Sequence, residues 1–275
     1  MRRFVRLAPL AVAFVVLGLA VGLPQAGAII NGTPDDGTVD GIIHPNVGIV
    51  YNDTVPWNSG FCSGTLISPT VFLTAGHCTA TFIPANIAHI HVSFDAHLSV
   101  SPENTIIAAN RIDVTGWETD PDFGYVRVLN DVGVFYLKDP VYGVTPAELP
   151  DVGFLDEQAA KNGLAGHEFD IVGYGLNSLD HPIASPQANF TWNQEREYST
   201  QRFRALTPND LAQFGPGTCY ADSGGPHFYG GDQPNLEVAL TSSGNPICTT
   251  GAWDNSQRLD TPAVHDWLQG ILADH

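Results

Sequence analysis

The sequence predicts an all-β protein that ends in one α-helix. Short apolar or alternating runs recur along the chain, separated by glycine, proline, asparagine and aspartate, as expected of strands joined by turns. The 28 glycines and 20 prolines disfavour long helices. With 275 residues, the chain is long enough to form two small barrels or sandwiches.

Nine segments have the composition of strands. They are residues 47–51, 61–67, 71–75, 87–94, 131–137, 169–174, 202–206, 236–242 and a short run near 258–259. The run 87–94 alternates, so His89 and His91 share one face, which we interpret as the solvent face of a strand rather than a metal site. Residues 140–163 show no strand pattern and are the predicted linker.

The closing helix has clear sequence signals. Thr261 can cap it and Pro262 suits its first turn. Apolar residues then recur at helical spacing at Val264, Trp267, Leu268 and Ile271. This spacing predicts an amphipathic helix with one buried face.

Residues 1–28 are predicted to be a secretory signal peptide. Three arginines open the segment, residues 10–23 are apolar, and Ala26-Gly27-Ala28 fits the small-residue cleavage rule. The apolar run is too short to span a bilayer. We therefore expect a secreted, extracellular protein without membrane attachment after cleavage.

The charge balance narrows the class of partner. The chain has 29 acidic against 11 basic residues, a formal net charge of −18, and three of the basic residues lie in the predicted signal. The mature chain is therefore more acidic still. Such a surface repels nucleic acid and anionic membranes, so we expect neither as a partner.

An even number of cysteines in an exported chain indicates disulfides. Four are present, and counting alone allows three pairings. None of them has the short C-x-x-C spacing that is typical of zinc ligands, so no metal is expected there. Glu118, Asp120 and Asp122 could form a calcium loop, but we interpret them as a solvated turn.

Three short motifs together suggest nucleophilic catalysis. "TCYADSGGP", residues 218–226, contains Ser223, whose hydroxyl needs a base and charge-stabilising donors to react. "LTAGHC" places His77 beside a cysteine at the end of an apolar run. "NDVGVFYL" opens with Asp131, a carboxylate that is costly at the head of a buried strand unless an imidazole N–H pairs with it.

In this order and context, the chain resembles the trypsin/chymotrypsin-like serine proteases from about residue 29 to the final helix. The resemblance implies two six-stranded antiparallel β-barrels, at 29–145 and 146–275, with the second barrel unit including the terminal helix. It also implies that Ser223 is the nucleophile, His77 the general base and acid, and Asp131 the orienting carboxylate. No cofactor is expected, and the substrates would be proteins or peptides cut by a monomer.

The resemblance extends to the activation pair and the disulfides. The implied disulfides are Cys62–Cys78 and Cys219–Cys248. "IING" at residues 29–32 is similar to the mature N-terminus of the family, whose ammonium pairs with the aspartate before the nucleophile. Cleavage after Ala28 would expose Ile29, which would pair with Asp222 without a separate zymogen peptide.

The substrate pocket is implied by position, and two positions depart from the family pattern. The backbone N–H groups of Ala221 and Ser223 would form the oxyanion hole, although the family has glycine at the first. "LTSSG" would place Ser242, Ser243 and Gly244 along the pocket, with Ser242 also supporting Asp131.

Gly217 would form the pocket floor, where trypsin-like members have aspartate. An open, uncharged pocket that takes apolar or aromatic side chains is therefore expected. The alternative is a catalytically weak or inactive protease-like binding protein.

Overall fold

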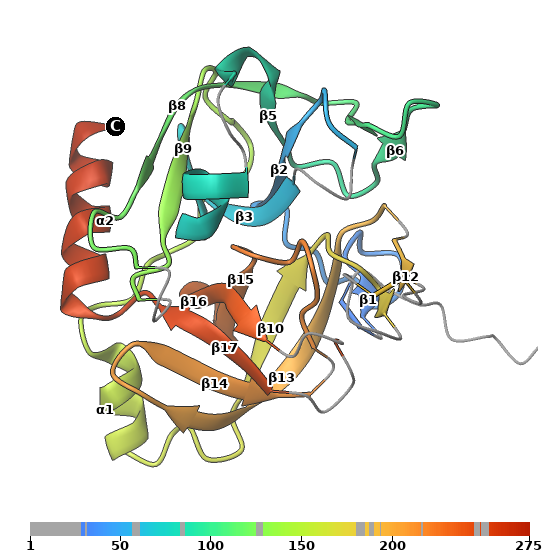
Figure 1. Ribbon diagram of the computed structural model, residues 1–275. Helices are drawn as coiled ribbons and strands as arrows, with labels where there is room; N and C mark the ends of the chain where they lie inside the picture. The colour runs from blue at the N-terminus through green and yellow to red at the C-terminus, as the bar shows by residue number, and fades with distance from the viewer. Residues whose placement is uncertain are drawn as a thin grey trace, which may run out of the picture.

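A computed structural model describes most of the chain (Figure 1). The described residues are 29–30, 32–56, 61–82, 86–124, 129–179, 185–186, 190–192, 194–215, 217–244, 248 and 253–275. The predicted signal segment 1–28 lies outside them. The predicted fold class is confirmed, because two six-stranded antiparallel barrels and a C-terminal helix make up the molecule.

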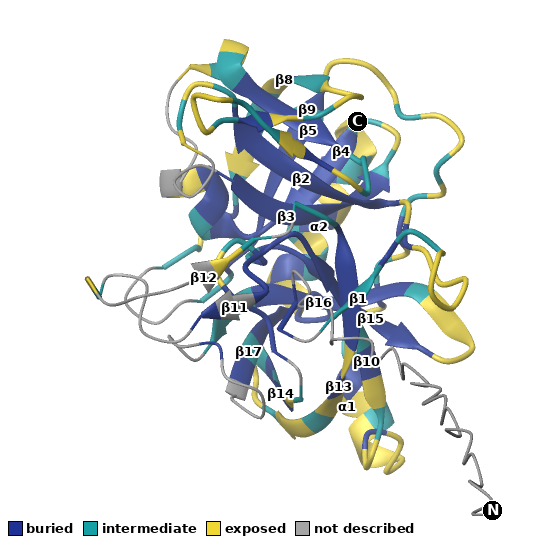
Figure 2. Cartoon of the chain, turned by 90° about the vertical axis from the view of Figure 1, so that its right-hand side faces the viewer, coloured by how far each residue is buried: buried dark blue, intermediate teal, exposed yellow. Residues whose placement is uncertain are grey.

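The first barrel is closed by strands from the N-terminal half of the chain. Its order is β2-β3-β4-β9-β8-β5, and every neighbouring pair is antiparallel. The strands are β2 (Val47–Asn52), β3 (Phe61–Ser68), β4 (Val71–Thr74), β5 (Ile90–Ser93), β8 (Ile112–Thr119) and β9 (Gly133–Leu137). Apolar residues of β2, β3, β4 and β9 belong to one buried core cluster. Figure 2 colours these strands largely as buried.

The second barrel uses strands from the C-terminal half. Its sheet has the order β1-β13-β10-β15-β16-β17-β14, and a further pairing of β13 with β14 closes the ring. The strands are β1 (Thr33–Pro34), β10 (Glu168–Gly173), β13 (Glu197–Leu206), β14 (Asp210–Phe214), β15 (Pro226–Gly230), β16 (Gln233–Gly244) and β17 (Trp253–Arg258). The short β1 thus attaches the start of the described chain to this barrel.

The C-terminal helix α2 (Pro262–Asp274) forms where its spacing predicts. It runs beside the first barrel (Figure 1), where Val264, Leu268 and Ile271 join that barrel's core. Thr261 is the N-cap by position but makes no side-chain cap hydrogen bond. In the described part of the chain, no helix is long and apolar enough to cross a membrane.

Several elements differ from the sequence prediction. Strands β8, β14 and β15 were not predicted, because each mixes polar and apolar residues and its pattern is defined only by pairing with neighbours. Within the predicted linker, α1 (Phe154–Ala160) forms a helix too short to show a period, with Leu155 as its only buried residue. The remaining elements are the small hairpins β6 (Ser99–Val100) with β7 (Ile106–Ile107) and β11 (Ser178–Leu179) with β12 (Phe190–Thr191), the helical turn Cys78–Phe82 and the 3-10 turn Ile87–His89.

The interpretation of the two histidines as a solvent face was wrong for His91. That side chain is 2% exposed, and its ring nitrogens lie 3.1 Å from Asp53 Oδ2 and 3.2 Å from Asp113 Oδ1. Only His89, in the 3-10 turn before β5, is partly exposed, and it contacts the other oxygen of Asp53 at 2.9 Å. The alternation failed because every residue of β5 is buried, so this strand has no solvent face.

A buried ion pair joins the two barrels. Arg196, just before β13, has its Nε 2.6 Å from Asp35 Oδ2, and both residues are at most 2% exposed. The same guanidinium donates to the carbonyl oxygens of Val47 at 3.1 Å and Phe94 at 3.2 Å in the first barrel. His44 Nδ1 lies 2.8 Å from the other oxygen of Asp35. A buried charge pair persists when such extra hydrogen bonds satisfy its remaining groups.

A buried carboxyl group on the second barrel lies close to the first barrel, and neither of its oxygens has a hydrogen bond that meets the usual distance and angle criteria. Glu237 on β16 is fully buried, and burial raises the pKa of its carboxyl well above the usual 4.5, against a partial lowering by Thr65 on β3. A protonated carboxyl is therefore the form that this site favours.

Candidate active site

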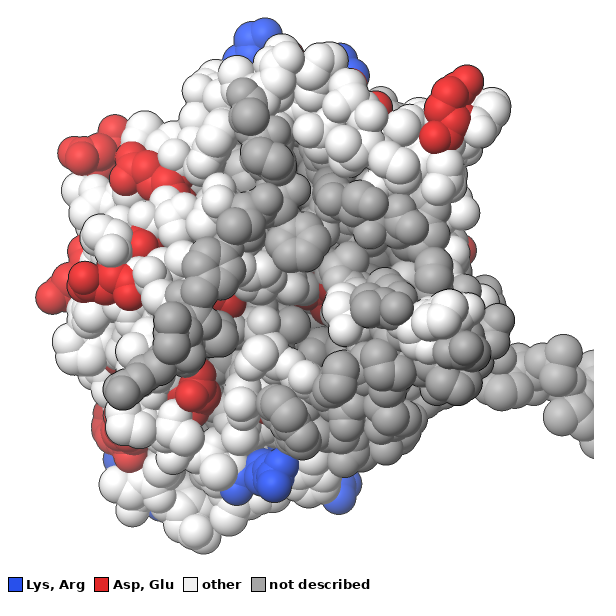
Figure 3. Space-filling model, in the orientation of Figure 1, with Lys and Arg blue, Asp and Glu red and all other residues white. Residues whose placement is uncertain are grey.

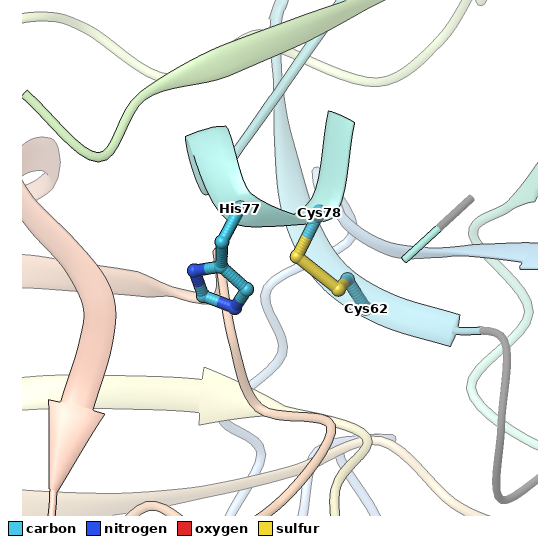
Figure 4. A group of neighbouring side chains, drawn as sticks. All are labelled: Cys62, His77 and Cys78. Carbon is cyan, nitrogen blue, oxygen red and sulfur yellow. A yellow bond between two sulfur atoms is a disulfide. The ribbon is translucent and has the colours of Figure 1, made fainter. Parts of the chain in front are cut away.

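His77 sits at a rigid junction between a strand and a helical turn. It follows β4 by three residues and directly precedes the helical turn Cys78–Phe82. The disulfide Cys62–Cys78 ties that turn to β3, beside the imidazole (Figure 4). Among described residues, the cysteine sulfurs and His77 are the only three potential metal-ligand groups close together. Because both sulfurs are in a disulfide, they are not the thiolates that bind metals.

Asp131 holds the backbone and the ring of His77 at once. Its Oδ1 accepts from the His77 backbone N–H at 2.8 Å, and its Oδ2 lies 2.8 Å from His77 Nδ1. Ser242 Oγ donates to the same Oδ2 at 2.6 Å, and the Asp131 N–H donates to Gln257 Oε1 at 3.0 Å. The carboxylate has no exposed surface. With Nδ1 as the donor to Asp131, a neutral imidazole presents Nε2 as an acceptor, which is what a general base needs.

The turn that carries Ser223 packs against the strand end that leads to His77. Gly224 has φ +79°, and a Cβ there would lie only 2.1 Å from Thr74 Oγ1 and 2.6 Å from the Ala75 nitrogen. Only glycine fits this close approach. Cys78 Sγ lies 4.0 Å from the Ser223 carbonyl oxygen. The fold thus brings the segments of the predicted base and nucleophile together.

Ala221 takes up the conformation that is normally reserved for glycine. Its φ is +77°, so the backbone does not avoid the left-handed region. Its carbonyl oxygen accepts from Ser63 Oγ at 3.1 Å, and Ser63 Oγ accepts in turn from the Tyr174 N–H at 2.9 Å. The surrounding hydrogen bonds therefore fix a strained residue in the predicted oxyanion segment.

A pocket opens beside Ser223. Its lining residues are Thr218, Cys219, Tyr220, Ser223, Thr241, Ser242, Ser243, Gly244 and Cys248. The disulfide Cys219–Cys248 joins two of its walls. The predicted residues Ser242, Ser243 and Gly244 therefore share one pocket with the predicted nucleophile, and Gly217 directly precedes the lining residue Thr218.

The sequence analysis missed one charged residue near this pocket. Asp254 on β17 is 2% exposed, and a Cβ on Gly217 would lie 3.4 Å from its Oδ2. Burial, partly offset by hydrogen bonds from Gln201 and Thr218, raises the pKa of this carboxyl. The signal that could have identified it is the pairing of β16 with β17, which sets Asp254 opposite Gly244. That register was not evident from sequence.

The predicted activation residues are both buried. Ile29 has no exposed surface, and the neighbouring Ile30 N–H donates to the Gly217 carbonyl oxygen at 3.1 Å. Asp222 is also fully buried, and its two oxygens accept from the N–H groups of Gly175 and Cys219, each at 2.8 Å. Burial first, and repulsion from Glu197 and Asp254 after it, raises the pKa of Asp222 well above the usual range.

Glu118 and Asp120, two of the residues considered for a calcium loop, have different surroundings. Glu118 accepts from Tyr136 Oη at 2.8 Å, whereas Asp120 is 4% exposed and accepts from the Asp122 N–H at 2.8 Å. The interpretation as a solvated turn was thus wrong for Asp120. Burial, more than any neighbour, raises the pKa of its carboxyl.

Comparison with known proteins agrees with this geometry. The family model named Trypsin matches residues 43–264. A trypsin of Saccharopolyspora erythraea is 28% identical over 71% of this chain and 81% of its own length. Trypsin II-P29 of Gallus gallus is 26% identical over 78% of this chain and 81% of its own length. Brachyurin of Leptuca pugilator is 28% identical over 76% of this chain and 86% of its own length. The match to the family model covers most of the sequence, including both barrels. The chain belongs to the trypsin family of serine proteases.

Proposed function

We propose that this protein is a secreted serine endopeptidase that uses His77, Asp131 and Ser223 to form an acyl-enzyme. The observation that supports this most is the set of hydrogen bonds from His77 and Ser242 to Asp131, next to a pocket lined by Ser223. A buried carboxylate that orients an imidazole is the arrangement that makes a serine hydroxyl reactive.

The proposed reaction has two halves. His77 Nε2 takes the proton from Ser223 Oγ as this oxygen attacks the scissile carbonyl carbon. The N–H groups of Ala221 and Ser223 donate to the resulting oxyanion. His77 then gives its proton to the leaving amine, and the C–N bond breaks to leave an ester on Ser223. Water, deprotonated by His77, hydrolyses the ester and restores the serine.

Maturation would complete the site. Cleavage after Ala28 would create an ammonium group at Ile29, and we propose that it pairs with Asp222. The buried carboxylate, whose pKa is raised by burial, supports this idea because a cation would compensate for its lost hydration. Sequencing the N-terminus of secreted, active protein tests it, and a start at another residue would contradict it.

The charge distribution suits a peptide substrate in an extracellular setting. On the face shown in Figure 3, acidic side chains lie mainly along the left side and at the upper right, and Lys and Arg lie at the upper and lower edges. This surface does not favour nucleic acid. We propose protein or peptide substrates and a monomeric enzyme.

A fluorophosphonate probe tests the catalytic proposal and its alternative. We expect covalent labelling of Ser223 that is lost in Ser223→Ala and strongly slowed in His77→Ala. The matched controls are Ser99→Ala and His97→Ala, which change exposed residues of the same types. A folded protein that is not labelled would favour the inactive, binding form of the fold.

A further inference from the structure

Ser63 on β3 of the first barrel contacts the segment that is proposed to form the oxyanion hole. Its Oγ donates to the Ala221 carbonyl oxygen at 3.1 Å and accepts from the Tyr174 N–H at 2.9 Å. Ser63 has no exposed surface. Because a buried hydroxyl with both a donor and an acceptor partner is fixed in orientation, this contact joins the two barrels at a defined point.

The peptide groups on either side of the Ala221 Cα are both held by other segments. The Tyr220 carbonyl oxygen accepts from the Leu176 N–H at 2.9 Å, and the Ala221 carbonyl oxygen accepts from Ser63 Oγ. Since peptide groups are planar and trans, fixing these two oxygens also fixes the direction of the Ala221 N–H and the φ of +77°. The N–H that would donate to an oxyanion is therefore oriented by hydrogen bonds from outside its own turn.

An alanine in this conformation needs such support. Glycine takes a positive φ at little cost, whereas the left-handed region is unfavourable for alanine. Without an outside hydrogen bond, Ala221 would relax to a negative φ and change the direction of its N–H. Ser63 opposes this change, because rotation of the Ala221 carbonyl would leave the buried hydroxyl without its acceptor.

Close packing and a disulfide hold Ser63 itself in place. A Cβ at Gly173 would lie 3.3 Å from Ser63 Oγ, so the hydroxyl lies against the backbone of β10. The preceding residue, Cys62, forms the disulfide to Cys78, which directly follows His77. Consecutive residues of β3 therefore tie the segment of the proposed base and the proposed oxyanion segment to one strand.

We propose that Ser63 is a positioning residue that holds Ala221 in a conformation suited to glycine, so that an alanine can serve in the oxyanion hole. The alanine at position 221 and the hydroxyl at position 63 thus form a compensating pair. This inference rests on the proposed protease function and adds a residue of the first barrel to the stabilisation of the oxyanion.

The test uses a peptide p-nitroanilide that the unsubstituted enzyme cleaves, with the aldehyde and the alcohol of the same peptide as inhibitors. The aldehyde forms a tetrahedral adduct with Ser223 whose oxygen needs the oxyanion hole, whereas the alcohol binds without an adduct. In Ser63→Ala, we expect kcat to fall and the inhibition constant of the aldehyde to rise, each about tenfold, which is less than the loss from removing an oxyanion donor outright. KM and the inhibition constant of the alcohol should change by less than about threefold. An equal loss of affinity for both inhibitors would indicate general distortion and would overturn the inference.

Ser93 provides the matched control. It is also a fully buried serine of the first barrel, and Ile49 on β2 is the cross-strand partner of both serines, so Ser93 lies on the other side of β2 from Ser63. Its Oγ accepts from the Asp95 N–H at 3.1 Å. Ser93→Ala should leave kcat and both inhibition constants within about threefold of the unsubstituted enzyme.

A rescue experiment separates positioning from a purely structural role. Because glycine tolerates a positive φ without outside support, adding Ser63→Ala to Ala221→Gly should lower kcat by less than about threefold. This comparison also decides the question if Ser63→Ala alone does not fold. A further loss of about tenfold or more, or an unfolded double variant, would show that the hydroxyl acts elsewhere and would overturn the inference.

The outcomes separate this inference from the proposed function. An active enzyme in which Ser63→Ala keeps its kcat and its affinity for the aldehyde would overturn the role of Ser63 and leave the protease intact. Absence of both fluorophosphonate labelling and hydrolysis in the unsubstituted protein would overturn the proposed function itself, and the role of Ser63 with it.

Discussion

Replacing Ala221 by glycine should stabilise this protein, although glycine usually does the opposite. Ala221 has φ +77°. The left-handed conformation of an L-residue other than glycine destabilises the folded state by about 1–2 kcal/mol, and glycine avoids this cost. Glycine also makes the unfolded chain more flexible, which costs about 0.5–1 kcal/mol. The difference predicts a net gain of about 0.5–1 kcal/mol for Ala221→Gly.

Thermal unfolding followed by circular dichroism measures this gain. In a domain of this size, 1 kcal/mol shifts Tm by about 2–4 °C, so we expect a rise of about 1–4 °C. The N–H of residue 221 is retained, and fluorophosphonate labelling of Ser223 should therefore persist.

A second alanine provides the matched control. Ala159 is exposed in α1 and is not among the residues with positive φ. Ala159→Gly should destabilise by about 0.5–1 kcal/mol, the ordinary cost of glycine in a helix. If Ala221→Gly lowered Tm as much as Ala159→Gly does, the argument from backbone strain would be refuted.

Three further predictions follow from buried polar groups. Asp35→Asn should destabilise by about 3–5 kcal/mol in urea unfolding, because it leaves the Arg196 guanidinium buried without its charge partner; a change below 1 kcal/mol would contradict this. Since the pKa of Glu237 is raised above its usual 4.5, the folded state keeps a proton that the unfolded state loses, so stability falls as pH rises above that value. Glu237→Gln should flatten this slope between pH 5 and 8, and identical slopes would argue against it. Ser242→Ala removes a hydrogen bond to the charged Asp131, worth about 1.5 kcal/mol, and should lower kcat/KM roughly tenfold; unchanged kinetics would show that the bond does not position the carboxylate.

Local patterns in the sequence were sufficient for much of this protein. The period of Val264, Leu268 and Ile271 predicted the buried face of α2, since a helix shows its environment within its own residues. The motifs around His77, Asp131 and Ser223 indicated the trypsin family, to which the chain belongs, because each has a distinctive local composition.

Only the tertiary structure revealed features that depend on pairing between distant segments. The position of Asp254 opposite Gly244 and beside Gly217 followed only from the β16–β17 register. His91 was buried by contacts with Asp53 and Asp113 from other parts of the barrel. A residue's own neighbours in sequence determine its periodicity and its turn chemistry, whereas burial and charge partners are determined by strands that meet only after the chain has folded.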